Sequence, residues 1–325
     1  MPLAIVINEY GDSSVLQLQE VEVPAPGPGE LRLRQLSVGV NFHDIYVRSG
    51  LYKTLTPPGI LGCEAAGVVE AVGDGVSDFH VGDRVAYVTG PPYGAYASHR
   101  VLAANLVVPL PDGIDDDLAA AVLLRALTVD MLARQVVQLK PGMSILVHAA
   151  AGGVGRLLCQ QAAHLGVTVY GTVGSEEKAE IARASGCAHP ILYRKVAFED
   201  EVTRLTEGRG VDVVYDSIGA DTFAGSLTVL APCGHLVNFG QSSGPVEPVA
   251  MSTLAEKSLT VTRPILFHYI GETEKNREMA AAVFQGFAKG ILWTEAPTVL
   301  PLAEAHAAHD QLESRKATAG VVLKP

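Results

Sequence analysis

Several features that mark whole classes of protein are scarce or absent in this sequence. Only four cysteines occur, with no Cys-x-x-Cys pair, so their spacing fits neither a disulfide framework nor a zinc clip. Each is expected to be a small core residue: Cys63, Cys159, Cys187 and Cys233. No run approaches the roughly 20 apolar residues that a membrane-spanning helix needs. The first residues also lack the basic region and the cleavage site of a secretory signal, which favours a cytoplasmic protein.

Positive charge is scarce as well. The chain has 24 lysines and arginines against 35 aspartates and glutamates, which gives a formal net charge of -11 at pH 7. Proteins that bind nucleic acid gain much of their affinity by neutralising phosphates with basic side chains. This composition therefore disfavours nucleic acid as a partner.

The length and the apolar content indicate a folded protein of two domains. Of the 325 residues, 48% are apolar and 18% are charged, which is enough apolar material for large cores and argues against disorder. Two domains of roughly 150 residues each are expected for this length.

The sequence changes character near residue 117. Before about residue 110, short apolar runs such as 31–36 and 65–72 alternate with turns rich in Gly, Pro and Asp, which predicts a β-rich domain. Strands are then expected at 144–147, 168–172, 211–215 and 235–239, and helices at 155–165 and 176–184. A helix at 274–289 and a strand at 321–323 follow. Strands that alternate with helices predict an α/β domain with a parallel sheet.

A glycine-rich turn joins the strand 144–147 to the next helix. Gly152, Gly153, Val154 and Gly155 lie at the helix start, where glycines let backbone N–H groups approach a pyrophosphate. The spacing departs from G-x-G-x-x-G because Ala150 occupies its first position. A tight turn without a ligand would have the same glycines, but the flanking strand and helix favour a dinucleotide site.

The end of the second strand bears on the choice of nucleotide. An NAD site has an acidic side chain there for the ribose hydroxyls, whereas this chain has Gly174 and Ser175, with Lys178 three residues later. These residues suit a 2′-phosphate. Ser175 could equally be a helix cap and Lys178 a solvated charge, and capping and phosphate binding are compatible at one helix start.

Four segments, in this order, carry a family resemblance. They are Asn41-Phe-His-Asp44-Ile-Tyr46-Val-Arg48-Ser49-Gly50, Gly62-Cys63-Glu64-Ala-Ala-Gly67, Gly82-Asp83-Arg84-Val85 and Ala149-Ala-Ala-Gly-Gly-Val-Gly155. On these segments the chain resembles the medium-chain dehydrogenase/reductase superfamily over essentially its whole length. Within that superfamily it is similar to the zinc-free NADPH:quinone oxidoreductases related to ζ-crystallin.

The resemblance implies a Rossmann doubly wound parallel sheet inserted into a GroES-like β-rich catalytic domain. The implied limits are 1–125 for the first part of the catalytic domain, 126–259 for the Rossmann NADPH-binding domain and 260–325 for the C-terminal part of the catalytic domain. An active site in the cleft between the domains, and a homodimer paired through Rossmann edge strands, are also implied.

The resemblance also assigns site residues. Tyr46, Tyr52 and Asn41 are implied to be catalytic. The residues implied to bind NADPH are Asn41, Thr128, Gly152, Gly153, Val154, Gly155, Ser175, Lys178, Tyr193, Ser217, Phe239, Gly240 and Lys316. Metal-binding relatives have a zinc ligand at the positions of Asn41 and Cys63, and one cysteine does not make a tetrahedral site, so no metal is expected. Cys63 is then either a small core residue or a thiol near the cleft that makes the enzyme sensitive to oxidants. Arg125 stands where the branch commonly has a glutamine or lysine, so it is given no role, and His43 is expected to be a packed histidine.

Two classes of function remain. The first is a metal-free reductase that transfers hydride from NADPH to a quinone or to an enone, with the carbonyl polarised by hydrogen bonds such as those of a tyrosine hydroxyl. The second is a non-catalytic NADPH-binding protein, either a nucleotide sensor or an RNA-binding module, and the negative charge disfavours RNA. The identity of the quinone or enone stays open.

Overall fold

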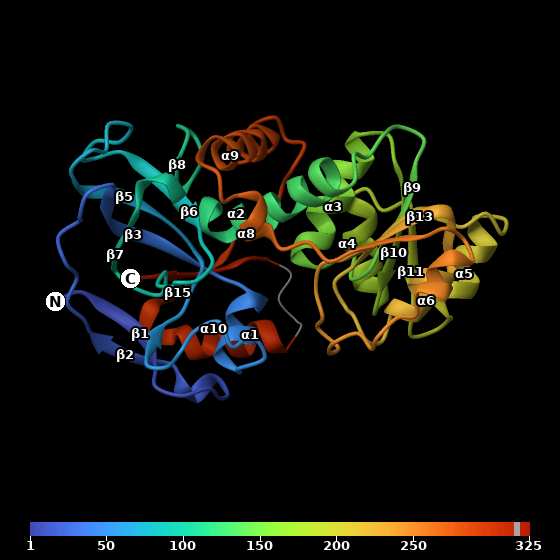
Figure 1. Ribbon diagram of the computed structural model, residues 1–325, viewed down its shortest axis with the longest axis horizontal. Coiled ribbons are helices and arrows are strands. Elements are labelled where there is room, and N and C mark those ends of the chain that lie inside the picture. The colour runs from blue at the N-terminus through green and yellow to red at the C-terminus, as the bar shows by residue number, and fades with distance from the viewer. Residues whose placement is uncertain (315–318) are drawn as a thin grey trace. The chain divides into compact units, whose positions relative to one another are not determined.

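The computed structural model describes residues 1–314 and 319–325, which belong to two compact units (Figure 1). Unit 1 comprises Met1–Leu127, Phe267–Lys289 and Thr294–Pro325, and unit 2 comprises Thr128–Leu266 and Gly290–Trp293. Unit 1 is therefore discontinuous in sequence, since the chain returns to it after unit 2. The finer domain limits expected at residues 125 and 259 stay predictions.

Unit 1 is built on two β-sheets. The larger has the strand order β15-β16-β3-β5-β6-β8, with β7 also paired to β3, and the smaller has the order β2-β1-β4. The strands are β1 (Leu3–Ile7), β2 (Gln17–Glu20), β3 (Glu30–Val40), β4 (Gly59–Ile60), β5 (Glu64–Val72), β6 (Arg84–Val88), β7 (His99–Ala103), β8 (Val107–Pro109), β15 (Thr298–Pro301) and β16 (Val321–Lys324). The predicted β-rich first domain is confirmed.

Strand β3 shows why this region forms sheets. Leu31 and Leu33 are buried, while the side chains between and after them, Arg32 and Arg34, are more exposed, as expected when successive side chains point to opposite faces. Antiparallel pairing places Leu31 opposite Val72 of β5. The buried faces of both sheets contribute to one apolar core, so the two predicted strands at 31–36 and 65–72 are confirmed.

The helices fall in both units. They are α1 (Phe42–Arg48), α2 (Asp116–Asp130), α3 (Gly153–His164), α4 (Glu176–Ala184), α5 (Phe198–Leu205), α6 (Phe223–Thr228), α7 (Met251–Ala255), α8 (Leu266–Tyr269), α9 (Thr273–Ala288) and α10 (Ala305–Glu313). Short 3-10 turns occupy η1 (Ser13–Val15), η2 (Ala104–Leu106) and η4 (Leu302–Glu304), and a π-helical turn, η3 (Met131–Val136), follows α2. Helix α10, near the C-terminus, lies beside α1, near the N-terminus (Figure 1).

Unit 2 contains a six-stranded parallel sheet. Its order is β11-β10-β9-β12-β13-β14, made of β9 (Ser144–Val147), β10 (Thr168–Val173), β11 (His189–Leu192), β12 (Val211–Asp216), β13 (Leu230–Asn238) and β14 (Thr260–Thr262). All five neighbouring pairs are parallel. The order of connection reverses between β9 and β12, which is the topological switch point where doubly wound sheets bind nucleotides. The predicted parallel α/β domain is confirmed.

The structure also corrects details of the sequence prediction. Helix α3 begins at Gly153, two residues before the predicted start, so two of the turn glycines belong to its first turn. Strands β11 and β14 were not predicted, because each is short and β11 contains Pro190. The prediction that Cys233 is a core residue is wrong, because Cys233 is exposed and has a left-handed φ of 62°. The other three cysteines are buried, as predicted.

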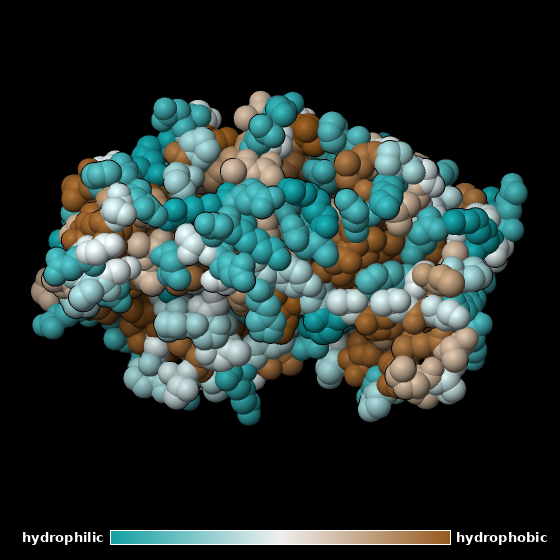
Figure 2. Space-filling view, turned by 45° about the horizontal axis from the view of Figure 1, so that its top comes forward, coloured by the Kyte–Doolittle hydropathy of each residue, from teal (hydrophilic) through white to brown (hydrophobic). Residues whose placement is uncertain are grey.

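The apolar content is used for cores. In the described part of the chain, no helix is long and apolar enough to cross a membrane. The face drawn in Figure 2 is largely hydrophilic, with apolar residues in separate patches. Most large apolar side chains of β3, β5, β9 and β12 are buried, which is the usual source of folding free energy.

Candidate active site

The carboxyl ends of four neighbouring strands bring together most of the predicted nucleotide-binding residues. Strands β9, β10, β12 and β13 are parallel, so the segments that follow them meet at one edge of the sheet. The glycine turn follows β9, Gly174 and Ser175 follow β10, Ser217 follows β12, and Phe239 and Gly240 follow β13. The sequence had placed them at strand ends, and the strand order makes those ends adjacent.

The glycine turn leaves the first amides of α3 open. Gly152 is the N-cap, no side chain caps the helix, and its first turn contains no acidic residue. Gly152 and Gly153 are exposed. A Cβ at Gly155 would lie only 2.3 Å from the Ala149 carbonyl oxygen, so this position accepts only glycine without movement of the backbone. Uncapped amides at the positive end of a helix are suited to a diphosphate.

The end of β10 carries hydroxyl and basic groups. Ser175 is the N-cap of α4, and its Oγ accepts a hydrogen bond from the Lys178 backbone N–H at 3.3 Å, so the predicted cap is present. Glu176 in the first turn forms an ion pair with Lys195 at 2.7 Å, which offsets its charge. A 2′-phosphate would find a hydroxyl and cations here.

Arg194, a residue that the sequence interpretation missed, lies close to Gly174. A Cβ at Gly174 would lie 3.1 Å from the Tyr193 hydroxyl and 3.6 Å from Nε of Arg194. Tyr193 and Arg194 are exposed and come directly after β11, the neighbour of β10 in the sheet. Arg194 was detectable, since it is the residue after Tyr193 and offers a fixed positive charge.

Two buried side chains hold this edge in place. Asp216, at the end of β12, accepts hydrogen bonds from the Ile218 amide at 2.8 Å and from the Thr222 hydroxyl at 2.9 Å, and so shapes the loop that carries Ser217. His148, directly after β9, contacts Thr172 Oγ1 at 3.1 Å and Ser226 Oγ at 2.9 Å. Burial lowers the pKa of His148 to about 4, so it is neutral at pH 7. Both are structural supports that the sequence interpretation did not include.

The predicted tyrosines lie in an aromatic cluster of unit 1. The rings of Tyr46, in α1, and Tyr52, just after it, pack edge to face with centroids 5.1 Å apart. His43 lies 5.7 Å from Tyr52, 5.6 Å from Tyr93 and 5.5 Å from Phe267, ring centre to ring centre. We call these five residues the aromatic cluster. Such a cluster can accept a flat conjugated molecule and donate hydrogen bonds from tyrosine hydroxyls.

His43 is a packed histidine, as expected. Its Nε2 lies 2.9 Å from the Tyr93 hydroxyl, which also lies 2.8 Å from Thr54 Oγ1. Burial lowers the pKa of His43 to about 4 and raises that of Tyr93 to about 12, so both are neutral at pH 7. Tyr93 and Phe267 were missed, because neither lies near a recognisable motif.

Asn41 is the buried N-cap residue of α1. Its backbone N–H donates to Asp44 Oδ2 at 2.8 Å, and its Nδ2 donates to Glu64 Oε1 at 3.1 Å. Burial raises the pKa of both Asp44 and Glu64 to about 7, against the opposing effect of these hydrogen bonds. Two buried carboxyl groups therefore surround a residue that was predicted to be catalytic.

A chain of polar contacts runs from Asp44 to α10. The Tyr96 hydroxyl donates to Asp44 Oδ2 at 3.2 Å and lies 2.9 Å from His309 Nε2. His309 Nδ1 lies 3.1 Å from Nη1 of Arg48, and Arg48 binds both carboxylate oxygens of Glu313 at 3.0–3.1 Å. Arginine only donates, so His309 accepts at Nδ1 and, being neutral, donates from Nε2. We call this the α1–α10 polar chain.

The remaining predicted positions are less informative. Thr128 is buried in α2, and Lys316 lies outside the described residues. Arg125 donates to the Val40 carbonyl oxygen at 3.4 Å, and its charge partly opposes the burial that raises the pKa of Glu64. Cys63 is fully buried in the core of unit 1 and burial raises its pKa, so it does not have the properties of a reactive thiolate.

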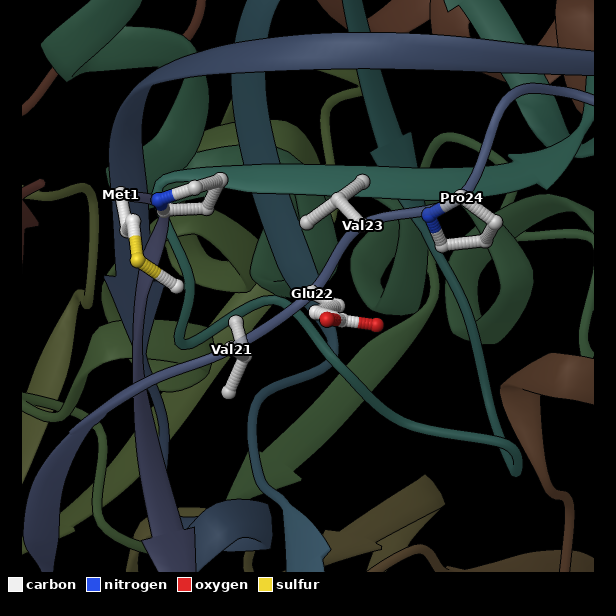
Figure 3. Close-up of a pocket in the computed structure, with 6 residues that line it drawn as sticks. Met1, Val21, Glu22, Val23 and Pro24 are labelled. Carbon is white, nitrogen blue, oxygen red and sulfur yellow. The ribbon is translucent and has the colours of Figure 1, made fainter.

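The described residues contain no cluster of metal ligands, and the pocket in Figure 3 lies away from the predicted site residues. Within residues 1–314 and 319–325, no three His, Cys, Asp or Glu side chains are grouped as metal ligands would be. The pocket in Figure 3 is lined by Met1, Pro2, Val21, Glu22, Val23 and Pro24, none of which was predicted to bind nucleotide or substrate.

Comparison with known proteins identifies the family. Residues 27–112 match the alcohol dehydrogenase GroES-like domain, and residues 153–284 match the zinc-binding dehydrogenase family. The quinone oxidoreductase of Pseudomonas aeruginosa is 48% identical over 97% of both chains. The 2-haloacrylate reductase of a Burkholderia species is 42% identical over 100% of this chain and 99% of its own.

A solved structure agrees with these relatives. The Escherichia coli quinone oxidoreductase complexed with NADPH aligns with a TM-score of 0.96 and 40% identity, over 99% of this chain and 100% of that one. The predicted fold class, a Rossmann sheet inserted into a GroES-like domain, is confirmed. The chain belongs to the quinone oxidoreductase family of the medium-chain dehydrogenase/reductase superfamily.

Proposed function

We propose that this protein reduces quinones or related conjugated carbonyl compounds with hydride from NADPH. The observation that carries the proposal is the carboxyl edge of the unit 2 sheet, where open amides follow β9 and a hydroxyl with basic side chains follows β10. The family relatives named quinone oxidoreductase support the acceptor class.

The residues of unit 2 fit NADPH. We assign the diphosphate to the turn of Gly152, Gly153, Val154 and Gly155, in which the Gly152 N–H already donates to the Ala149 carbonyl oxygen at 2.8 Å. The 2′-phosphate is assigned to Ser175, Lys178 and Tyr193, with Arg194 as an added cation. The nicotinamide half is assigned to Thr128, Ser217, Phe239 and Gly240 of this unit, and the role of Asn41 in unit 1 stays a prediction. When bound, NADPH supplies the hydride. The protein's part is to hold the nucleotide, with Gly174 and Ser175 in place of a carboxylate directly after β10; of the two acidic residues that follow, Glu176 and Glu177, Glu176 is paired with Lys195.

The aromatic cluster of unit 1 is assigned to the acceptor. A tyrosine hydroxyl donates a hydrogen bond without ionising at neutral pH, so Tyr46 and Tyr52 can polarise a carbonyl oxygen as negative charge builds on it. His43 and Tyr93 are neutral and hydrogen-bonded to each other, so they add no opposing charge. These residues can bind the acceptor without a metal ion. That the reaction itself needs no metal stays a prediction.

A second acceptor class has a specific observation in its favour. The relative named 2-haloacrylate reductase covers nearly the same length at 42% identity, so a small conjugated acid or enone is the alternative acceptor. A panel of quinones, enones and haloacrylates, each supplied with NADPH, separates the two by relative kcat/KM.

A homodimer through a sheet edge, such as β14, and a cytoplasmic location stay predictions.

The assay for the function is consumption of NADPH with 1,4-benzoquinone, followed by nicotinamide absorbance. We expect turnover that is unchanged after treatment with EDTA and no oxidation of ethanol, because alcohol oxidation without a Lewis acid lacks a means of stabilising the alkoxide. Turnover that disappears on chelation, or ethanol oxidation with NADP⁺, would contradict the proposal. Tight NADPH binding without turnover of any acceptor would favour a nucleotide sensor instead.

The Tyr52 hydroxyl is expected to matter for turnover more than for nucleotide binding. Tyr52→Phe removes one donor and little surface, so kcat for 1,4-benzoquinone should fall roughly tenfold while the Kd for NADPH stays within about twofold. Tyr170→Phe is the matched control, since Tyr170 lies buried in β10 of unit 2. Equal kcat values for Tyr52→Phe and the native protein would remove Tyr52 from the mechanism.

A further inference from the structure

Three hydrogen-bonded side chains lead from solvent into the aromatic cluster of unit 1. Thr54, on the loop after α1, is exposed, and its Oγ1 lies 2.8 Å from the Tyr93 hydroxyl oxygen. Tyr93 is only 8% exposed, and its hydroxyl oxygen lies 2.9 Å from Nε2 of His43. We call Thr54, Tyr93 and His43 the hydroxyl–imidazole row. All three residues belong to unit 1.

The inner end of the row is an open imidazole nitrogen. His43 Nδ1 makes no hydrogen bond with any residue that the structure describes. No polar atom of His43 is both buried and without a partner, so Nδ1 is open to solvent. The His43 ring packs against Tyr52 and Phe267, with ring centres 5.7 Å and 5.5 Å away. The open nitrogen therefore belongs to the cluster that is assigned to the acceptor.

The row can hold its protons in two arrangements. In the first, Thr54 donates to the Tyr93 oxygen, Tyr93 donates to Nε2, and the neutral His43 ring has its proton on Nδ1. In the second, Nε2–H donates to the Tyr93 oxygen, Tyr93 donates to Thr54, and Nδ1 has only a lone pair. Burial lowers the pKa of His43 to about 4 and raises that of Tyr93 to about 12, so both arrangements are uncharged at pH 7.

The proposed reaction needs a proton where the acceptor binds. When hydride adds to a quinone or an enone, the carbonyl oxygen becomes an oxyanion that takes up a proton. A single tyrosine that gave this proton would be left as a phenolate among apolar rings, which is costly. A donor that is resupplied as it gives its proton avoids that charge.

We propose that His43 is a catalytic proton donor to the acceptor, and that Tyr93 and Thr54 are positioning residues that resupply it from solvent. The inference rests on the proposed function. His43 Nδ1–H gives its proton to the oxyanion while the Tyr93 proton moves to Nε2. The Thr54 proton replaces that of Tyr93, and a water molecule gives its proton to Thr54 Oγ1.

The protons balance along the row. Each of the three side chains gives one proton and receives one, so the acceptor gains the proton that the water loses. The transfer converts the first arrangement into the second. Once the product has left, proton exchange between water and the open Nδ1 restores the first arrangement.

A purely structural role for the row makes a different prediction. If its hydrogen bonds only fix the loop that carries Thr54, their loss changes stability and KM, while the source of the proton stays the same. Tyr10→Phe is the matched control for this effect. The Tyr10 hydroxyl donates to the Leu55 carbonyl oxygen, so this variant also removes a tyrosine hydrogen bond to the same loop.

Three variants interrupt or keep the row. Tyr93→Phe removes the central hydroxyl, Thr54→Val replaces the outer hydroxyl with a methyl group, and Thr54→Ser keeps a hydroxyl. With saturating NADPH and 1,4-benzoquinone, kcat should fall roughly ten- to a hundredfold in Tyr93→Phe and Thr54→Val, because a positioned proton source is lost. In Thr54→Ser, kcat should stay within about twofold of the native value, since serine offers the same donor and acceptor.

The decisive measurement is the ratio of kcat in H₂O to kcat in D₂O. Interrupting the row makes the arrival of the proton slow, so the ratio should be larger in Tyr93→Phe and Thr54→Val than in the native protein. Thr54→Ser and the control Tyr10→Phe should keep the native ratio. The melting temperature of each variant is measured as well, and the Thr54 pair decides the question if Tyr93→Phe does not fold.

Failure of this inference and failure of the proposed function have different signatures. A raised ratio in the interrupted variants, with the native ratio in Thr54→Ser and Tyr10→Phe, supports the relay. A native ratio in Thr54→Val or in folded Tyr93→Phe, or an equal rise in Tyr10→Phe, would overturn the relay alone, because the native protein still turns over. A native protein that reduces no quinone or enone would overturn the proposed function and the relay with it.

Discussion

A Lys178→Ala variant is expected to bind NADPH roughly ten- to a hundredfold more weakly, with little change in its affinity for NADH. Strand β10 is followed by Gly174 and Ser175, without the carboxylate that would bind a free ribose 2′-hydroxyl and repel a phosphate. Absence of repulsion gives only tolerance of NADPH. Selectivity requires attraction, which we assign to Lys178 together with Tyr193 and Arg194.

The structure sharpens this prediction. Ser175 Oγ already accepts from the Lys178 backbone N–H, so the lysine lies in the first turn of α4, next to the cap. Lys140→Ala is the matched control: Lys140 is exposed and precedes β9, at the opposite edge of the same sheet. Similar native affinities for NADPH and NADH, or a Lys178→Ala variant with an unchanged ratio of the two, would refute the assignment.

An Arg48→Met variant is expected to lower the free energy of unfolding by about 2 to 4 kcal/mol, because it leaves the buried His309 Nδ1 and the Gly11 carbonyl oxygen without their donor and breaks the pair with the partly exposed Glu313. The Arg48 side chain is only 3% exposed. It donates to the Gly11 carbonyl oxygen at 3.2 Å, to His309 and to Glu313, and so joins α1 to α10. Methionine fills a similar volume but leaves three acceptors without their donor.

Two measurements check this result. Urea unfolding gives the loss of stability, and hydrogen exchange of the α1 and α10 amides shows whether the loss begins where the contact was. Arg183→Met is the control, since Arg183 pairs with Glu180 on an exposed helix surface where a salt bridge contributes less than about 1 kcal/mol. Equal stability of Arg48→Met and the control variant would mean that the α1–α10 polar chain does not stabilise the fold.

His309, in the α1–α10 polar chain, makes the free energy of unfolding depend on pH, and the sign of this dependence follows from its pKa. Burial and the charge of Arg48 lower the pKa of His309 to about 3, against 6.5 for an ordinary histidine. Between these values the unfolded chain binds a proton that the folded chain does not, so the contribution of His309 is complete above about pH 6.5 and is lost as the pH falls toward 3.

Much of the nucleotide-binding edge could be predicted from local sequence. Alternating apolar runs determine which segments are strands, and the glycines mark a tight turn in which a Cβ at Gly155 would lie 2.3 Å from the Ala149 carbonyl oxygen. Ser175 was predictable as a cap, because capping depends on residues only three positions apart. The resemblance then supplied the discontinuous domain arrangement, which composition and periodicity do not contain.

The surroundings of Asn41 depended on the tertiary structure. Glu64, Tyr96 and His309 lie 23, 52 and up to 261 residues from their partners, and no local pattern links such positions. Tyr93 and Phe267 were missed for the same reason, since their neighbours come from other segments of the chain. The sequence by itself therefore determined the elements, the glycine turn and the helix caps, where partners are close along the chain. Only the tertiary structure decided which buried polar groups face each other, because that depends on how distant segments pack.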